Sequence, residues 1–124
     1  MKLLVDTHVL IWLATGDKRL TRRAAETLSD PDQEVFVSVV SRWEIALKQR
    51  TANFRLSLPF DRLLSQSGYK GLDLAFDTPS LLDDLPDIHR DPFDRILVAQ
   101  ALLHDLTLVS GDQQIRRYPV PTLW

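Results

Sequence analysis

Four acidic residues of this chain lie where predicted strands end or predicted helices begin, and their spacing could bring them into one site. They are Asp6, Glu44, Asp94 and Asp112. Carboxylates that lie close together repel one another unless a cation neutralises them. Their hard oxygen atoms suit Mg²⁺ or Mn²⁺, and the chain has no cysteine that would favour zinc. The chemistry that these residue types indicate is therefore that of a divalent metal site.

The elements that must position these acids follow from the apolar pattern. Short apolar runs predict strands at residues 3–5, 35–37 and 106–109, and an alternating run predicts another at 72–76. Residues 119–123 could form only an edge strand, because their prolines cannot donate to a ladder. Since strands alternate with helices, we expect a mostly parallel sheet covered on both faces. The carboxyl ends of its strands share one edge, where the four acids would converge.

Segments with helical spacing of apolar residues separate these strands. The predicted helices cover residues 7–14, 21–29, 38 or 41 to 50, 60–67, 78–85 and 92–103. The last of them has the clearest start, because Asp91 suits the N-cap and Pro92 the first helical position. Ser110-Gly111-Asp112 predicts a turn into another helix, whereas the segment at 54–56 is ambiguous.

Each acid also has a purely structural interpretation. Ser41 and Glu44 fit a capping box, which stabilises a helix start by roughly 1 kcal/mol. Asp94 and Asp112 fit the acids that the helix macrodipole favours at a helix start. Taken singly, these three acids are better explained in this way. Asp6 differs, because a carboxylate within an apolar segment is costly to bury without a partner, and a metal ion is one such partner.

Length and composition limit the class of protein. A chain of 124 residues predicts one domain with a single core. Hydrophobic residues at 44% and charged residues at 26% are typical of a globular protein. The net charge of -2 gives no general indication of nucleic-acid binding, which would depend on local patches. Asp6 and His8 interrupt the N-terminal apolar run, so we expect no signal peptide, no membrane span and a cytoplasmic location.

The four acids lie within longer motifs that belong together. The motifs are MKLLVDTHVLIWL, SVVSRWEIALK, LPDIHRDPFDRILVAQA and LTLVSGD, and the chain ends with YPVPTLW. With these motifs the chain resembles the PIN-domain ribonucleases, in particular the VapC-type toxins of type II toxin–antitoxin systems, over essentially its whole length. The third motif is the most specific. The fourth departs from the Thr-x-Asp common in the family, but its serine keeps the hydroxyl group.

The resemblance implies a fold and an activity. The fold would be α/β, a PIN-like arrangement of three α/β/α layers with a mostly parallel central sheet of four to five strands, in one domain over residues 1–124. The activity would be that of a Mg²⁺-dependent endoribonuclease, with Mn²⁺ as a substitute, which hydrolyses RNA phosphodiester bonds with metal-activated water. The catalytic and metal-binding residues would be Asp6, Glu44, Asp94 and Asp112.

Other residues near the motifs receive supporting roles. Thr7 and Ser110 would hydrogen-bond to water or to the carboxylates, and Arg95 would be either a partner of the acids or part of a structural ion pair. His89 is interpreted as structural, because it precedes a helix and is expected to face away from the acids. The cations Arg42, Lys48 and Arg50 lie close to the helix start that carries Glu44 and are candidates for phosphate contacts.

The resemblance also implies partners. These are a cognate antitoxin, whose C-terminal segment would enter the acidic pocket, an RNA substrate for which tRNA is one family example, and a second copy of the chain in a homodimer. Trp12 and Trp43 are interpreted as core or partner-interface residues rather than as platforms for RNA bases. No membrane partner is expected.

Two readings from other classes remain open. A phosphoacceptor receiver domain has a similar sheet and an acidic Mg²⁺ site, but it needs a paired acid beside the first strand and a lysine after the last, and neither is visible. A catalytically silent PIN-fold module could retain the fold for antitoxin binding alone, although the presence of all four acids argues against it.

Overall fold

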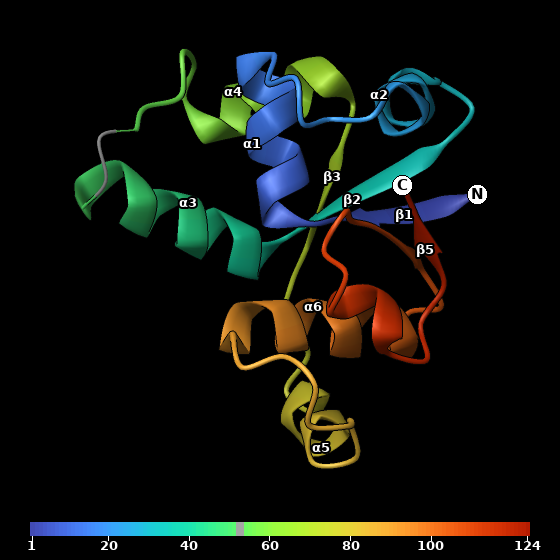
Figure 1. The fold of residues 1–124 in the computed structure, drawn as a ribbon. Coiled ribbons are helices and arrows are strands. Elements are labelled where there is room, and N and C mark those ends of the chain that lie inside the picture. The colour runs from blue at the N-terminus through green and yellow to red at the C-terminus, as the bar shows by residue number, and fades with distance from the viewer. Residues whose placement is uncertain (52–53) are drawn as a thin grey trace.

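The computed structural model describes residues 1–51 and 54–124, and in these ranges the chain forms one five-stranded sheet (Figure 1). The strands are β1 (Lys2–Val5), β2 (Glu34–Ser38), β3 (Lys70–Leu72), β4 (Thr107–Val109) and β5 (Thr122–Leu123). Their order is β3-β2-β1-β4-β5, and every neighbouring pair is parallel. The predicted parallel sheet is therefore confirmed, and the proline-rich C-terminal segment does lie at an edge.

Helices cover both faces of this sheet. The structure contains α1 (Thr7–Thr15), α2 (Arg22–Ser29), α3 (Val39–Thr51), α4 (Phe60–Ser67), α5 (Thr78–Leu82), α6 (Pro92–Leu103) and the 3₁₀ turn η1 (Ile115–Arg117). Figure 1 shows α1, α2 and α4 on one side of the strands and α5, α6 and η1 on the other. This arrangement confirms the three-layer α/β/α fold.

The alternation of side chains along β1 divides the core between these two layers. Leu3 and Val5 pack with Val9 of α1 and Leu28 of α2, whereas Leu4 packs on the opposite face with residues of α6. The side chains of Leu3, Leu4 and Val5 are all inaccessible to solvent. Because β1 is the central strand and is apolar on both faces, its end is held rigidly between two layers of helices. Asp6 follows at that end.

The helix caps observed at α6 and α3 agree with those predicted from the sequence. The side chain of Asp91 accepts a hydrogen bond from the backbone N–H of Phe93 at 2.9 Å, and Pro92 occupies the first turn of α6. At α3 the hydroxyl of Ser38 accepts from the N–H of Val40 at 3.0 Å, so the helix begins before Ser41. Of the two predicted starts, the earlier one is confirmed.

Three predicted elements differ from the structure. The strand predicted at 72–76 lies at Lys70–Leu72, because Leu72 pairs with Ser38, where β2 ends and offers no further partner. The short helix that begins at Thr78 ends at Leu82 rather than at residue 85. The turn after Asp112 leads only into the 3₁₀ turn η1. Residues 54–56 contain neither helix nor strand.

None of the helices within the described ranges is long and apolar enough to cross a membrane.

Candidate active site

The structure places the four predicted acids at the carboxyl ends of the three central strands. Asp6 directly follows β1 and caps α1, and Asp112 follows β4. Glu44 lies in α3, the helix that follows β2, and Asp94 lies in the first turn of α6. The chain leaves β1 and β4 toward opposite faces of the sheet, and ligands of parallel sheets collect at such a switch point. Asp6, Glu44 and Asp94 are each at most 6% exposed.

Ser110 connects the first and fourth motifs. Its hydroxyl donates a hydrogen bond to Asp6 Oδ2 at 2.8 Å and accepts one from the backbone N–H of Asp112 at 3.1 Å. Burial raises the pKa of the Asp6 carboxyl, and the bond from Ser110 offsets only part of that effect. Ser110 therefore supports Asp6 directly, as the sequence had suggested.

Gly111 allows this loop to lie close to the C-terminal tryptophan. A Cβ atom at position 111 would lie 2.5 Å from Cε2 of Trp124, closer than real Cβ contacts allow. The ring of Trp124 in turn packs against Trp12, with their centroids 5.9 Å apart. The absence of a side chain at Gly111 therefore permits the contact that covers the loop between Ser110 and Asp112.

Asp94 has a strongly perturbed acid–base equilibrium. Burial raises the pKa of its carboxyl to about 7, and repulsion from Asp6, Asp91 and Glu44 contributes in the same direction. A helix-start acid that served only the macrodipole would instead be stabilised in its ionised form. The repulsion shows that the acids share one electrostatic environment, which a cation would relieve.

Glu44 is not part of a capping box, because α3 begins at Val39 and places Glu44 in its second turn. The hydroxyl of Ser41 is instead 2.8 Å from that of Thr7, within a buried contact. Thr7 therefore joins α1 to α3 rather than bonding to a carboxylate, and of its two predicted partners the carboxylate is not the one observed. Glu44 Oε2 lies 3.7 Å from Nζ of Lys48, while its buried Oε1 has no hydrogen-bond partner within residues 1–51 and 54–124.

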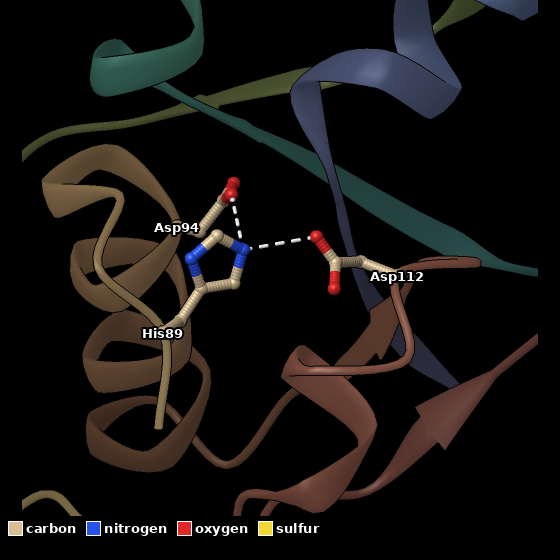
Figure 2. A group of neighbouring side chains, drawn as sticks. All are labelled: His89, Asp94 and Asp112. Atoms are coloured by element: carbon tan, nitrogen blue, oxygen red, sulfur yellow. Dashed lines mark hydrogen bonds and ion pairs between the residues drawn. The ribbon is translucent and has the colours of Figure 1, made fainter. Parts of the chain in front are cut away.

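His89 faces the acids, contrary to the prediction from the sequence. Its Nε2 lies 3.0 Å from Asp94 Oδ2 and 3.0 Å from Asp112 Oδ2 (Figure 2). The ring reaches them because the chain turns at residues 89–91, where the N–H of Asp91 donates to Nδ1 of His89 at 3.0 Å. The only sequence signal was a histidine two residues before a helix cap, which does not specify the direction of the ring.

Asp112 uses its two carboxylate oxygens differently. Oδ2 faces His89, whereas Oδ1 accepts hydrogen bonds from the backbone N–H groups of Gln114 at 2.8 Å and Ile115 at 3.3 Å. Partial burial alone would raise its pKa, but these bonds and the one from His89 outweigh that effect and hold the pKa of Asp112 below its usual range. One oxygen thus supports the loop, and the other remains directed into the site.

Arg95 points away from the acids and supports the segment that precedes α6. Its guanidinium donates to the backbone carbonyl oxygens of Pro86 at 2.9 Å and Leu82 at 3.1 Å, and to the hydroxyl of Tyr118 at 3.2 Å. In the described part of the chain it forms no ion pair with a site acid. The interpretation of Arg95 as a partner of the carboxylates is therefore wrong.

The residues present fit a divalent cation. The donor set consists of hard carboxylate oxygens, Glu44 Oε1 is buried without a hydrogen-bond partner among the described residues, and burial disfavours the ionised form of Asp94. Each of these features raises the free energy of the metal-free site, and a bound cation would lower it. Among the described residues, potential ligand atoms of His89, Asp94 and Asp112 lie within 4.8 Å of one another. Asp6 and Glu44 are not members of this group, although repulsion from both raises the pKa of Asp94.

The family model of the PIN domain matches residues 3–121. The chain therefore belongs to the PIN-domain family, which confirms the family predicted from its motifs. Among its relatives is Ribonuclease VapC22 of Mycobacterium tuberculosis, which is 30% identical over 128 residues that cover 98% of this chain and 97% of that protein. The resemblance to the VapC type is thus confirmed as well.

Two solved structures share the fold. One is VapBC2 from Rickettsia felis, bound to a DNA fragment from their promoter, with a TM-score of 0.70, 11% identity, and coverage of 99% of this chain and 98% of that chain. The other is a toxin–antitoxin complex from Klebsiella pneumoniae, with a TM-score of 0.66, 19% identity, and coverage of 98% and 96%. At these identities the likeness establishes the fold alone.

Proposed function

We propose that this chain is a Mg²⁺-dependent endoribonuclease and the toxin of a VapBC-type toxin–antitoxin pair. The observation that carries the proposal is the convergence of Asp6, Glu44, Asp94 and Asp112 at the carboxyl ends of β1, β2 and β4, with Glu44 Oε1 buried and unpartnered. The 30% identity to a protein named Ribonuclease VapC22 supports RNA as the substrate.

The four acids would hold Mg²⁺, for which Mn²⁺ is a substitute. When bound, the cation would supply Lewis acidity, which polarises the scissile phosphate and makes water a better nucleophile at neutral pH. The chain's own residues orient the carboxylates. Ser110 directs Asp6 through its 2.8 Å hydrogen bond, and the rigid start of α6 directs Asp94.

Lys48 is the cation best placed to receive an RNA phosphate at this site. Its Nζ lies 3.7 Å from Glu44 Oε2 and 3.4 Å from Nε2 of His8, and its side chain is 35% exposed. Arg42 is already committed, because its guanidinium pairs with Asp61 at 2.7 Å on the surface. A substrate phosphate bound by Lys48 would lie next to the acidic site.

An apolar groove between α1, α3 and α4 suits a segment of the antitoxin. Its lining includes Leu10, Leu13, Ile45, Phe60, Leu64 and Tyr69. The two structural neighbours are toxin–antitoxin complexes, which supports an antitoxin partner for this chain. For the homodimer, the exposed side chains of Trp43 and Leu47 on α3 offer an apolar surface that a second copy could cover.

Cleavage of RNA by the purified chain tests the activity. We expect Mg²⁺ to support cleavage, EDTA to stop it, and Asp6→Asn to abolish it while the protein remains folded. Asp61→Asn is the matched control, because it removes an exposed acid outside the site, and it should cleave RNA as the parent does. Folded parent protein that binds an antitoxin but cleaves no RNA with either Mg²⁺ or Mn²⁺ would contradict the proposal and favour a silent interaction module.

A further inference from the structure

His89 lies between two acids of the site but is not one of the predicted metal ligands. Its Nε2 is 3.0 Å from an oxygen of Asp94 and 3.0 Å from an oxygen of Asp112, as Figure 2 shows. Its side chain is only 13% exposed. Position alone would allow two roles, either a nitrogen ligand to the cation or a hydrogen-bond donor to the carboxylates.

The other ring nitrogen distinguishes these roles. The backbone N–H of Asp91 donates to Nδ1 of His89 at 3.0 Å, so Nδ1 presents a lone pair and carries no hydrogen. A neutral imidazole with an unprotonated Nδ1 carries its hydrogen on Nε2. The backbone of His89 is held as well, because its N–H donates to the hydroxyl of Tyr118 at 2.8 Å. The ring therefore presents an N–H group to the two acids.

A nitrogen that carries hydrogen has no lone pair to offer to a cation. For Nε2 to become a ligand, the bond from Asp91 would have to break and the ring would have to change its tautomer. As the chain is folded, Nε2–H instead donates to Oδ2 of Asp112, while Oδ2 of Asp94 lies 3.0 Å from the same nitrogen at ion-pair distance. The remaining lone pairs of both acids stay available. Donors of this kind fix the orientation of carboxylate ligands at metal sites.

We propose that His89 is a positioning residue of the acidic site: its Nε2–H group, hydrogen-bonded to Asp112 and 3.0 Å from Asp94, sets the two carboxylates in the orientation that receives the cation. His89 does not itself bind the cation, and this inference rests on the proposed function. His89 contacts Asp94 and Asp112, whereas Glu44 has Lys48 3.7 Å from its Oε2, so the effect concerns the side of the site formed by α6 and the loop after β4.

Two substitutions separate the functions of the two ring nitrogens. In His89→Gln the side-chain amide can place an N–H group where Nε2 lies. In His89→Asn the shorter side chain keeps an acceptor near Nδ1 for the N–H of Asp91 but cannot reach the acids. Mn²⁺ affinity of the full chain, measured by calorimetry, should fall about 10- to 100-fold in His89→Asn and stay within roughly threefold of the parent in His89→Gln. Circular dichroism and thermal unfolding of both variants verify the fold.

Nitrogen NMR of the imidazole ring provides a readout that does not depend on activity. We expect His89 to remain protonated at Nε2 both in metal-free protein and in protein saturated with Mg²⁺. An unprotonated Nε2 in the Mg²⁺-saturated protein would overturn the inference and make His89 a ligand. If parent and both variants bind Mn²⁺ equally, the positioning role is wrong while the proposed function stands. If the parent itself binds no Mn²⁺, the proposed function fails and the inference fails with it.

Discussion

Asp94 and Asp112 contact the same nitrogen of His89 at 3.0 Å, yet their pKa values move in opposite directions. Asp94 is almost fully buried in the first turn of α6, whereas the side chain of Asp112 is 33% exposed. Burial and neighbouring carboxylates raise the pKa of Asp94 to about 7, while hydrogen bonds from His89 and two backbone N–H groups lower that of Asp112. A shared partner therefore does not determine the charge of an acid.

The two acids therefore differ in how much each would gain from a bound cation. Asp112 is ionised at neutral pH without any metal, because its oxygens are already satisfied by donors. Asp94 gains more from a cation, since burial and neighbouring carboxylates disfavour its charge, and so does Glu44 Oε1, which has no hydrogen-bond partner among the described residues. The predictions below test this difference.

Asp94→Asn should have the largest effect on RNA cleavage. We expect a fall of about 10²- to 10³-fold, the loss seen when one group that stabilises developing charge is removed. Asp112→Asn should cost less, roughly tenfold, because asparagine can still accept the backbone bonds that support the loop. Single-turnover cleavage with Mg²⁺ measures both variants. Equal losses in the two would contradict the difference between them.

Deprotonation of Asp94 should destabilise the metal-free protein as pH rises. Its folded pKa of about 7 lies above the ordinary value of 3.8, so the folded state keeps a proton that the unfolded chain releases between these values. The free energy of unfolding therefore falls across this window, by on the order of 4 kcal/mol, and is constant above it. Urea unfolding in EDTA at a series of pH values measures the fall.

Asp94→Asn should reduce this dependence and leave the part that Asp6 contributes, because burial raises the pKa of Asp6 as well. Saturating Mg²⁺ should flatten it, because a cation stabilises ionised carboxylates. Asp112 contributes with the opposite sign, since its lowered pKa gives stability that is lost only as the pH falls below the ordinary carboxyl range. A slope that persists in Asp94→Asn would belong to another group.

Gly111→Ala should disturb the Asp112 side of the site. The added methyl group would clash with the ring of Trp124, which must move or displace the loop that carries Ser110. We expect a loss of about 1–3 kcal/mol in the free energy of unfolding, the usual cost of overpacking. Gly71→Ala is the matched control, since a Cβ atom there meets no atom within 4 Å. Equal stability of the two variants would show that Trp124 does not restrain the loop.

Lys48→Ala should have the smallest effect and act on substrate binding. Removal of one phosphate contact should raise KM a few-fold and reduce the salt dependence of RNA binding by about one unit in the log–log slope. Arg23→Ala, an exposed cation on α2, serves as the comparison. If both variants show the same salt slope as the parent, Lys48 does not contact phosphate.

Patterns that depend on nearby residues were sufficient to predict much of this fold. The apolar runs predicted β1, β2 and β4, and Asp91-Pro92 predicted the start of α6. With a parallel sheet, these elements alone bring the four acids to one edge. The metal-binding roles of the acids were predicted from the same pattern and remain predictions.

Features set by distant contacts could not be predicted. A Ser-x-x-Glu spacing is the same whether α3 starts at Ser38 or at Ser41, and only the start at Ser38 moves Glu44 out of the first turn. The direction of the His89 ring depends on a turn before α6. Arg95 is directed by carbonyl oxygens of the preceding loop, whose path the sequence pattern does not specify.

The central claim is that Asp6, Glu44, Asp94 and Asp112 form one cation site. Anomalous diffraction from crystals soaked in Mn²⁺ tests it most directly, because the ion itself is located. The account predicts a manganese peak at the carboxyl ends of β1, β2 and β4, within about 2.0–2.4 Å of an Asp94 oxygen and of oxygens from at least one other acid. Soaked crystals in which manganese binds elsewhere, or in which no peak lies among these carboxylates, would contradict it.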